Sequence, residues 1–447
     1  MTVSLRSTSH RKRGPFPPNA QPKVVVLALY LRTIITSEGF SLSRSSRTAL
    51  SRRRVRHAAL AGTALLAATL TACGGGSGAA GAGGAAEMKK KPDMAVSVNL
   101  TGDRVKAGEP VTVTLAEGKL ALVKVTDAKG GELPGKISDD ARTWTSERNA
   151  APGTDYAVEA QNTDSQSAST RFATSAADKV NKLKINVPKG STVGVGMPVS
   201  VVFDNPVANK AEVEKALKVT TSNGTEGSWG WFKDYSGSDR IDWRPKEYWK
   251  SGTDVKVDMN LNGVDSGKGG GLFARDYTTE FKVGKDRRME VSLDTRKMKV
   301  TEDGQVVETI PVSAGTPGGQ KASWSGKMVL MSKEGTIRMD SQTVGLGDSY
   351  DKMVDYSMRL TWSGMYVHAA PWNTANFGRA NTSSGCVGMS TSDAADFYAK
   401  VQVGDPFEVV GSGSKGNAPL GNGYGEWNLS WDEWKTKSAL AAGAQNG

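Results

Sequence analysis

The sequence predicts a mainly β protein: two antiparallel β-sandwiches followed by a third, β-rich domain with a short helical extension. Three observations lead to this class. Short runs that alternate apolar and polar residues recur from about residue 93 onward, turn signals rich in Gly, Asp and Pro separate them, and convincing helical patterns are few. At 447 residues and 38% hydrophobic content, the chain is long enough for two to four domains.

Residues 1–72 form a leader whose charge differs from that of the rest of the chain. The leader holds twelve of the 57 basic residues and one of the 46 acidic residues, so the remainder carries 45 of each. The net charge of +11 therefore belongs to the leader. Because basic and acidic residues are equal in number after the leader, we see no basic patch and expect no nucleic-acid partner.

The leader has the order of a secretory signal. Arginines at 52–56 precede an apolar run at 58–70 that is too short to span a bilayer. Because the residues before this point are unusually numerous for a charged region, we expect the true translation start to lie nearer Val55.

Leu-Thr-Ala-Cys at the end of the leader resembles a lipobox. This resemblance implies cleavage before Cys73 and lipidation of its sulfur, which would anchor the protein to the outer face of the membrane. The alternative is an ordinary secretory signal with an incidental cysteine. Residues 73–92 then form a flexible tether rich in Gly and Ala. Lipidation of Cys73 would leave Cys386 without a disulfide partner.

Two units with β-sandwich patterns follow the tether. The first, residues 93–175, contains alternating runs such as 110–115 and 120–125. The second, residues 182–283, has similar runs and one short helix at about 210–216. Four tryptophans fall in the second unit, where aromatic clusters more often form the core than a sugar-stacking face: Trp229, Trp231, Trp243 and Trp249.

A third domain is expected at residues 285–410. Strands are predicted at about 289–293, 297–300 and 306–312, and Asp303-Gly304 is a strong hairpin signal between the last two. Residues 392–401 form its one convincing helix. The remaining residues, 411–447, form a tryptophan-rich extension in which Ser430 and Glu433 have the spacing of a capping box.

Residues 366–389 carry the chemistry of the third domain. His368 and Cys386 are the last histidine and the last cysteine of the chain, and both lie in a loop-rich stretch. A thiol is a strong nucleophile only as the thiolate, and a neighbouring imidazole can accept its proton. In Ser-Ser-Gly-Cys, Gly385 removes side-chain bulk, so backbone N–H groups beside the sulfur could face an oxyanion.

This stretch resembles the catalytic domain of bacterial L,D-transpeptidases, the YkuD domain. The resemblance rests on Val-His-Ala-Ala-Pro-Trp, the interval to Ser-x-Gly-Cys, and the residues up to 410. The sandwiches resemble the immunoglobulin-like modules of longer members, and the extension resembles their C-terminal segment, which packs on the catalytic domain. Ser384 stands where the family usually has a second histidine, and Gly388 stands where it usually has asparagine.

The resemblance implies a cysteine acyltransferase that acts in the cell wall. Cys386 would attack a peptidoglycan stem tetrapeptide, release D-alanine and form a thioester, which an amine of a second stem resolves as a 3→3 cross-link. His368 would be the base and acid, held by the backbone carbonyl of Ala369, and Gly385 would contribute an oxyanion donor. Four residues are expected at the substrate: Tyr350, Trp372, Ser384 and Gly388.

Two other functions remain open from the sequence. The same thioester could be hydrolysed, which would make the protein an L,D-carboxypeptidase. The departures at Ser384 and Gly388 could instead mark a catalytically silent lipoprotein that binds the wall through its sandwiches. Carbapenem β-lactams are expected inhibitors of the enzyme. We expect no cofactor, because the chain after the leader keeps one histidine and one free thiol, which do not make a metal site.

Overall fold

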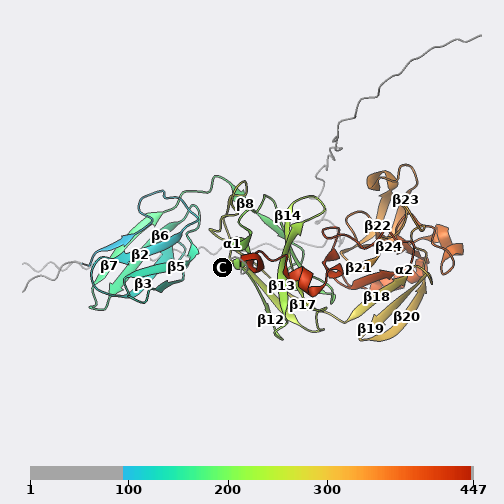
Figure 1. Ribbon diagram of the computed structural model, residues 1–447, viewed down its shortest axis with the longest axis horizontal. Helices are drawn as coiled ribbons and strands as arrows, with labels where there is room; N and C mark the ends of the chain where they lie inside the picture. The colour runs from blue at the N-terminus through green and yellow to red at the C-terminus, as the bar shows by residue number, and fades with distance from the viewer. Residues whose placement is uncertain (1–93, 444–447) are drawn as a thin grey trace, which may run out of the picture. The chain divides into compact units, whose positions relative to one another are not determined.

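The computed structural model describes residues 94–443 (Figure 1). The leader, the tether and the lipidation site at Cys73 lie outside these residues. The described part is mostly β, as the sequence predicts, with short helices near its C-terminal end. Within it, no helix is long and apolar enough to cross a membrane.

The first sandwich consists of two antiparallel sheets with the strand orders β1-β2-β5-β4 and β3-β6-β7. Alternate side chains of its strands, including Val111, Val125 and Val158, are fully buried between the sheets. The strands are β1 (Val96–Val98), β2 (Pro110–Leu115), β3 (Leu120–Asp127), β4 (Gly135–Ile137), β5 (Thr143–Asn149), β6 (Asp155–Asn162) and β7 (Ser167–Ala173).

The second sandwich pairs the sheets β13-β14-β11-β9 and β10-β17-β15-β12, with the short pair β16-β8 beside them. It begins at Val180, two residues before the predicted boundary. Its helix lies where the sequence predicts one. The elements are β8 (Val180–Asn181), β9 (Leu183–Ile185), β10 (Ser191–Val193), β11 (Val199–Phe203), α1 (Lys210–Lys215), β12 (Leu217–Thr221), β13 (Gly227–Lys233), β14 (Asp239–Pro245), β15 (Asp254–Met259), β16 (Leu272–Phe273) and β17 (Tyr277–Val283).

The four tryptophans of the second sandwich belong to its core. All four are buried in one hydrophobic cluster, and Trp243 stacks on Trp249 with ring centroids 5.1 Å apart. This confirms the core interpretation and leaves these indoles unavailable for stacking on sugars.

The third domain contains a five-stranded sheet, β20-β19-β18-β26-β21, and a four-stranded sheet, β22-β23-β24-β25. The elements are β18 (Arg287–Ser292), β19 (Lys297–Glu302), β20 (Gln305–Pro311), β21 (Gly326–Val329), β22 (Ser332–Asp340), the 3-10 helix η1 (Ser341–Val344), β23 (Asp351–Arg359), β24 (Tyr366–Ala369), the 3-10 helix η2 (Pro371–Asn376), β25 (Val387–Met389), α2 (Thr391–Lys400) and β26 (Pro406–Val410).

Local signals in the third domain produce the predicted structure. Asp303 and Gly304 both have positive φ, 47° and 81°, as the tight turn between β19 and β20 requires. Helix α2 starts after Ser390, whose hydroxyl accepts the N–H of Asp393. The helix buries Phe397 and packs against β23 and β24.

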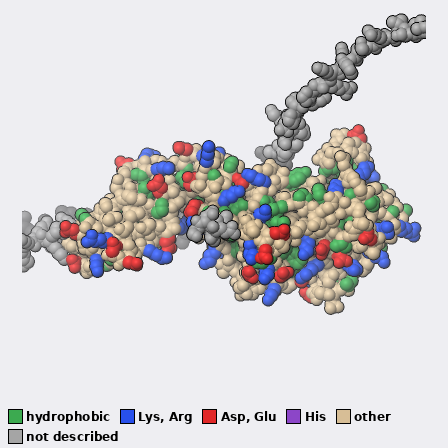
Figure 2. All heavy atoms as spheres, viewed as in Figure 1, with side chains coloured by type: hydrophobic (Ala, Val, Ile, Leu, Met, Phe, Trp, Pro, Cys, Tyr) green, Lys and Arg blue, Asp and Glu red, His purple; other side chains and the backbone are tan. Residues whose placement is uncertain are grey.

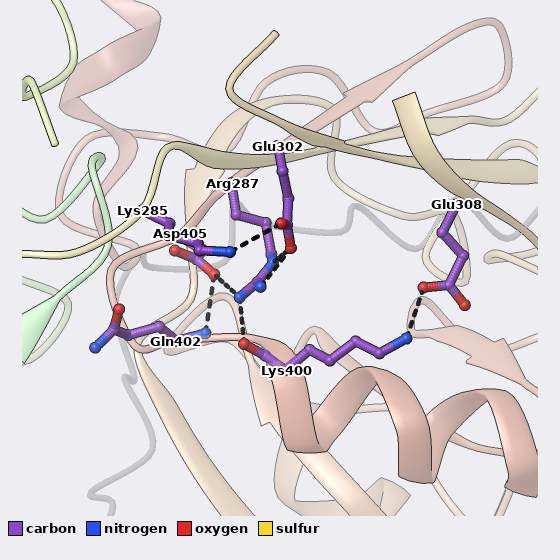
Figure 3. A network of polar contacts seen from close by, with 7 residues as sticks. All are labelled: Lys285, Arg287, Glu302, Glu308, Lys400, Gln402 and Asp405. Carbon is purple, nitrogen blue, oxygen red and sulfur yellow. Dashed lines mark hydrogen bonds and ion pairs between the residues drawn. The ribbon is translucent and has the colours of Figure 1, made fainter. Parts of the chain in front are cut away.

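Figure 3 shows a polar network at the C-terminal end of α2. Arg287 pairs with Glu302 at 2.5 Å and also donates to the backbone carbonyl of Lys400, the last residue of α2. Asp405 accepts the N–H of Gln402, and burial raises the pKa of Asp405 to about 7. The side chain of Gln402 donates to a backbone carbonyl of the second sandwich at 2.8 Å. The network therefore holds α2 against both β18 and the neighbouring sandwich.

The C-terminal extension packs on the catalytic domain, as the family resemblance implies, and also on the second sandwich. Its elements are the 3-10 helix η3 (Gly425–Asn428), α3 (Trp431–Lys435) and α4 (Ala439–Gly443). The indoles of Trp427 and Trp434 donate to Gly196 and Ser228 of the sandwich at 2.9 and 3.0 Å. The predicted capping box at Ser430 is present.

We expect Trp434→Ala to lower the free energy of unfolding by about 3 to 5 kcal/mol, because it removes a fully buried indole and its hydrogen bond. The matched control is Trp431→Ala, since Trp431 is only partly buried on the same helix. Urea unfolding of both variants measures the difference. Equal losses for the two would contradict this packing account.

Acidic and basic side chains are interspersed over the visible face of the described residues (Figure 2). This mixture agrees with the equal numbers of the two charge types after the leader.

Candidate active site

Two adjacent strands place His368 and Cys386 on the same face of a sheet. Strand β24 carries His368, and it pairs in parallel with β25, which begins one residue after Cys386. His368 lies opposite Gly388 in this register, so Cys386, two residues earlier, projects to the same side. The alternate residues Val367 and Val387 face the hydrophobic core. The interval of eighteen residues thus brings base and thiol together through a parallel pair.

The imidazole of His368 is held by its neighbour. Its Nδ1 lies 2.7 Å from the backbone carbonyl oxygen of Ala369, the contact that the family resemblance implies. Since a carbonyl only accepts, Nδ1 carries the proton and Nε2 is left as the basic nitrogen. His368 is buried, and this burial lowers the pKa of its imidazole.

The thiol of Cys386 is protonated at neutral pH in this structure. It is 9% exposed, and burial raises the pKa of the Cys386 thiol to about 11, against a smaller opposing effect of the backbone N–H of Tyr366 and of Lys415. Its hydrogen bond runs to the carbonyl of Gly364 at 3.6 Å. The resting pair is therefore a thiol and a neutral imidazole.

Two cavities meet beside the cysteine. The first, of about 190 Å³, is lined by both His368 and Cys386. The second, of about 450 Å³, is lined by Gly385 and Lys415. Tyr350 and Ser384 line both cavities and so stand between them. The nucleophile candidate itself lines the smaller of the two cavities.

Ser383 organises the turn that carries the thiol. Its hydroxyl donates to the carbonyl of Cys386 at 2.5 Å and accepts the N–H of Gly385 at 3.2 Å. Gly385 has φ of 125°, a conformation that favours glycine. An oxyanion would therefore compete with the Ser383 hydroxyl for the N–H that the sequence suggests as a donor.

The other predicted residues lie at the cavities. Tyr350 has its pKa raised to about 12, mainly by burial and also by Cys386. Trp372 is 48% exposed, lines the first cavity, and stacks on His368 with ring centroids 6.0 Å apart. Ser384 and Gly388 also line the first cavity. The structure thus brings together the residues that the sequence suggests for substrate binding.

Family models and known relatives match most of the chain. Residues 102–265 match the model of a bacterial Ig domain, and residues 286–409 match that of the L,D-transpeptidase catalytic domain. L,D-transpeptidase 2 of Mycobacterium tuberculosis is 33% identical over 406 residues, which cover 87% of this chain and 97% of the relative. The chain belongs to the L,D-transpeptidase family. The family consists of acyltransferases with a cysteine nucleophile.

Two further L,D-transpeptidases are similar over part of the chain, the first of them from the same organism. L,D-transpeptidase 5 is 30% identical over 336 residues, covering 74% of this chain and 73% of that protein. The solved structure of LD transpeptidase LdtMt1 in complex with imipenem is 34% identical and covers 52% of this chain and all of its own, with a TM-score of 0.44.

This L,D-transpeptidase has local packing that suits its departure at Gly388. A Cβ atom added there would lie 2.9 Å from the Cβ of Ala370, closer than real Cβ contacts. An asparagine at this position would require Ala370 to move. Ser384 lines both cavities, so a larger side chain at this position would occupy part of their volume.

Several residues at the cavities were not predicted from the sequence, among them the polar residues Lys352, Asn373 and Lys415. Lys352 follows Tyr350 by two residues, so strand alternation could have placed both on one face. Lys415 belongs to the C-terminal extension, and no local pattern connects it to the thiol. Within the described residues, no cluster of His, Cys, Asp or Glu could hold a metal ion.

The raised thiol pKa predicts the reactivity of the free enzyme. Since the fraction of thiolate grows about tenfold per pH unit below a pKa of about 11, alkylation of Cys386 by iodoacetamide should accelerate about tenfold per unit from pH 7 to 10. Peptide mapping at each pH measures the rate at Cys386. A rate that levels off below pH 8 would instead indicate a preformed thiolate–imidazolium pair.

Proposed function

We propose that this protein is a peptidoglycan L,D-transpeptidase that forms 3→3 cross-links between stem peptides through a thioester on Cys386. The observation that carries this proposal is the placement of His368 and Cys386 on one face, in one cavity, with Nδ1 of the imidazole held by Ala369. Nucleophile, base and orienting group thus come from adjacent strands.

The first half-reaction transfers the acyl group to the enzyme. The Sγ proton of Cys386 moves to Nε2 of His368 as sulfur attacks the carbonyl carbon of the third stem residue. Collapse of the tetrahedral intermediate breaks the C–N bond, and His368 returns the proton to the departing nitrogen. D-alanine leaves, and the third residue remains as a thioester.

The second half-reaction reverses these roles. An amine of a neighbouring stem attacks the thioester, gives its proton to His368 and forms the new amide. The thiol then recovers its proton from the imidazole. Because proton transfer accompanies each attack, a resting thiol with a pKa of about 11 is compatible with this cycle.

Incubation of the protein with a disaccharide-tetrapeptide, followed by mass spectrometry, tests the proposal. A dimer that has lost one D-alanine is the expected product, and Cys386→Ala should form none. Tripeptide without dimer would support the L,D-carboxypeptidase instead. No turnover, together with retained binding to sacculi by Cys386→Ala, would support the silent wall-binding protein.

We also propose that Cys73 carries a lipid anchor that holds the enzyme at the outer face of the cell membrane, within reach of the wall. The apolar run before Cys73 and the tether after it support this location. Carbapenems are proposed inhibitors, because their strained amide carbonyl offers Cys386 an acyl donor. The imipenem complex of a related transpeptidase is consistent with this proposal.

A further inference from the structure

The cavity that holds His368 and Cys386 contains an unneutralised positive charge. No Asp or Glu is among its lining residues, and Lys352 is its one lysine or arginine. The acids nearest in the strand register, Asp340 and Asp351, both pair with Arg338, at 3.8 and 2.6 Å. Within the described residues, Lys352 forms no ion pair.

Lys352 is held at the cavity wall by an aromatic ring. Its Nζ lies 4.4 Å from the ring centroid of Trp372, and the same ring stacks on His368. A cation over an indole face is attracted to it while its remaining N–H groups stay available. The ammonium group of this exposed side chain therefore lies over the same ring that stacks on the imidazole of His368.

Asn373 offers a second donor to the same cavity. Its amide oxygen accepts hydrogen bonds from Asn376 at 2.7 Å and from Thr382 at 3.1 Å. The amide NH₂ of Asn373 therefore points away from Asn376 and Thr382. This NH₂ group has no hydrogen-bond acceptor within the described part of the chain. An ammonium group and an amide NH₂ that both lack acceptors are the donors that a carboxylate requires.

The proposed reaction indicates which carboxylate of the substrate would lie near Lys352 and Asn373. His368 must protonate the departing nitrogen, and it lines the cavity of about 190 Å³ and not the larger one. The leaving residue, a small amino acid with a free terminal carboxylate, therefore lies in the smaller cavity. Cys386 lines the same smaller cavity, so the carbonyl that it attacks lies there as well.

We propose that Lys352, together with Asn373, binds the terminal carboxylate of the residue that leaves the donor stem. This inference rests on the transpeptidase function proposed above and deepens it, because it assigns a specificity-determining residue. A donor with a further residue or an amidated end would lack a carboxylate at this position and leave Lys352 unpaired. The site would thus select stems by the position of their chain end.

Two donors that differ only at the chain end test this assignment. The full-length protein is given a tetrapeptide with a free C-terminal carboxylate and the same peptide as its C-terminal carboxamide, and kcat/KM is measured for each. We expect the wild type to prefer the free acid by about 10- to 100-fold, as for a charge-assisted hydrogen bond. Lys352→Ala should reduce this ratio to near one, Lys352→Glu should favour the amide, and Lys352→Arg should retain the preference.

The matched control is Lys415→Ala, which should keep the ratio of the wild type. Lys415 is the one formally charged residue lining the other cavity, and its Nζ lies 5.4 Å from the ring of Trp324. A wild type without preference, or a Lys352→Ala variant that slows both donors equally, would overturn the assignment.

A binding measurement separates this inference from the proposed function. In the Cys386→Ala background, the dissociation constants of the two peptides should show the same preference, and adding Lys352→Ala should remove it. If the wild type turned over neither donor, the transpeptidase proposal would fail while the binding ratio still decided the role of Lys352. Equal binding of acid and amide would refute that role.

Discussion

Cys386→Ser is expected to lower the rate of cross-link formation by at least about 1,000-fold while the protein stays folded. A serine hydroxyl is a far weaker nucleophile at neutral pH than a thiol, and nothing else in the proposed cycle forms the acyl intermediate. The substitution is nearly isosteric at a position that is 9% exposed, so it should disturb the packing little. Dimer formation from disaccharide-tetrapeptide, measured by mass spectrometry, gives the rate.

Binding to sacculi serves as the control for this loss. The Cys386→Ser protein should bind as the wild type does, because the sandwiches and the cavity walls are unchanged. Cross-linking at a tenth of the wild-type rate or faster would show that Cys386 is not the nucleophile.

His368→Gln is expected to lower kcat/KM by about 100- to 10,000-fold at pH 7, the range typical of a lost general base. Burial lowers the pKa of His368, so the imidazole of the wild type is neutral at pH 7 and activity should persist somewhat below pH 6.5 before protonation of the base reduces it. The variant depends on spontaneous ionisation of a thiol with a pKa of about 11. The kcat/KM of the variant should therefore increase with pH, and the ratio of the wild-type value to the variant value should fall between pH 7 and 10.

The pH profile distinguishes a base from a structural residue. A merely structural role for His368 would lower the rate by the same factor at every pH. Such parallel profiles in the two proteins would remove His368 from the proposed mechanism, whatever the size of the loss.

Local sequence signals predicted most of the fold because they act over few residues. Alternation of apolar side chains located the sandwich strands, Asp303-Gly304 located a hairpin, and the spacing of Ser430 and Glu433 located a helix start. The docking surface of the extension could not be predicted in this way. Trp434 needs a complementary surface, and the backbone at Gly230 provides it from a strand about 200 residues earlier.

The candidate site, like the fold, could be predicted from the sequence only in part. His368 and Cys386 could be recognised because their residue types and interval define the chemistry, and Ala369 follows from adjacency alone. The cavities depend on segments that only the fold brings together. A role for Lys352 could be inferred only from the structure. Asp351 pairs with Arg338 and not with Lys352, and the ammonium group of Lys352 lies over the ring of Trp372. No pattern within one segment of the sequence encodes these contacts.

Trapping of the acyl-enzyme tests the central claim most directly. The protein is mixed with a tetrapeptide donor whose side-chain amine is blocked, so that no acceptor is present, and the intact mass is recorded within the first turnovers. We predict a mass increase equal to the donor minus D-alanine, mapped to Cys386 and removed by hydroxylamine. Release of D-alanine without any adduct on Cys386, or an adduct on another residue, would contradict the thioester mechanism.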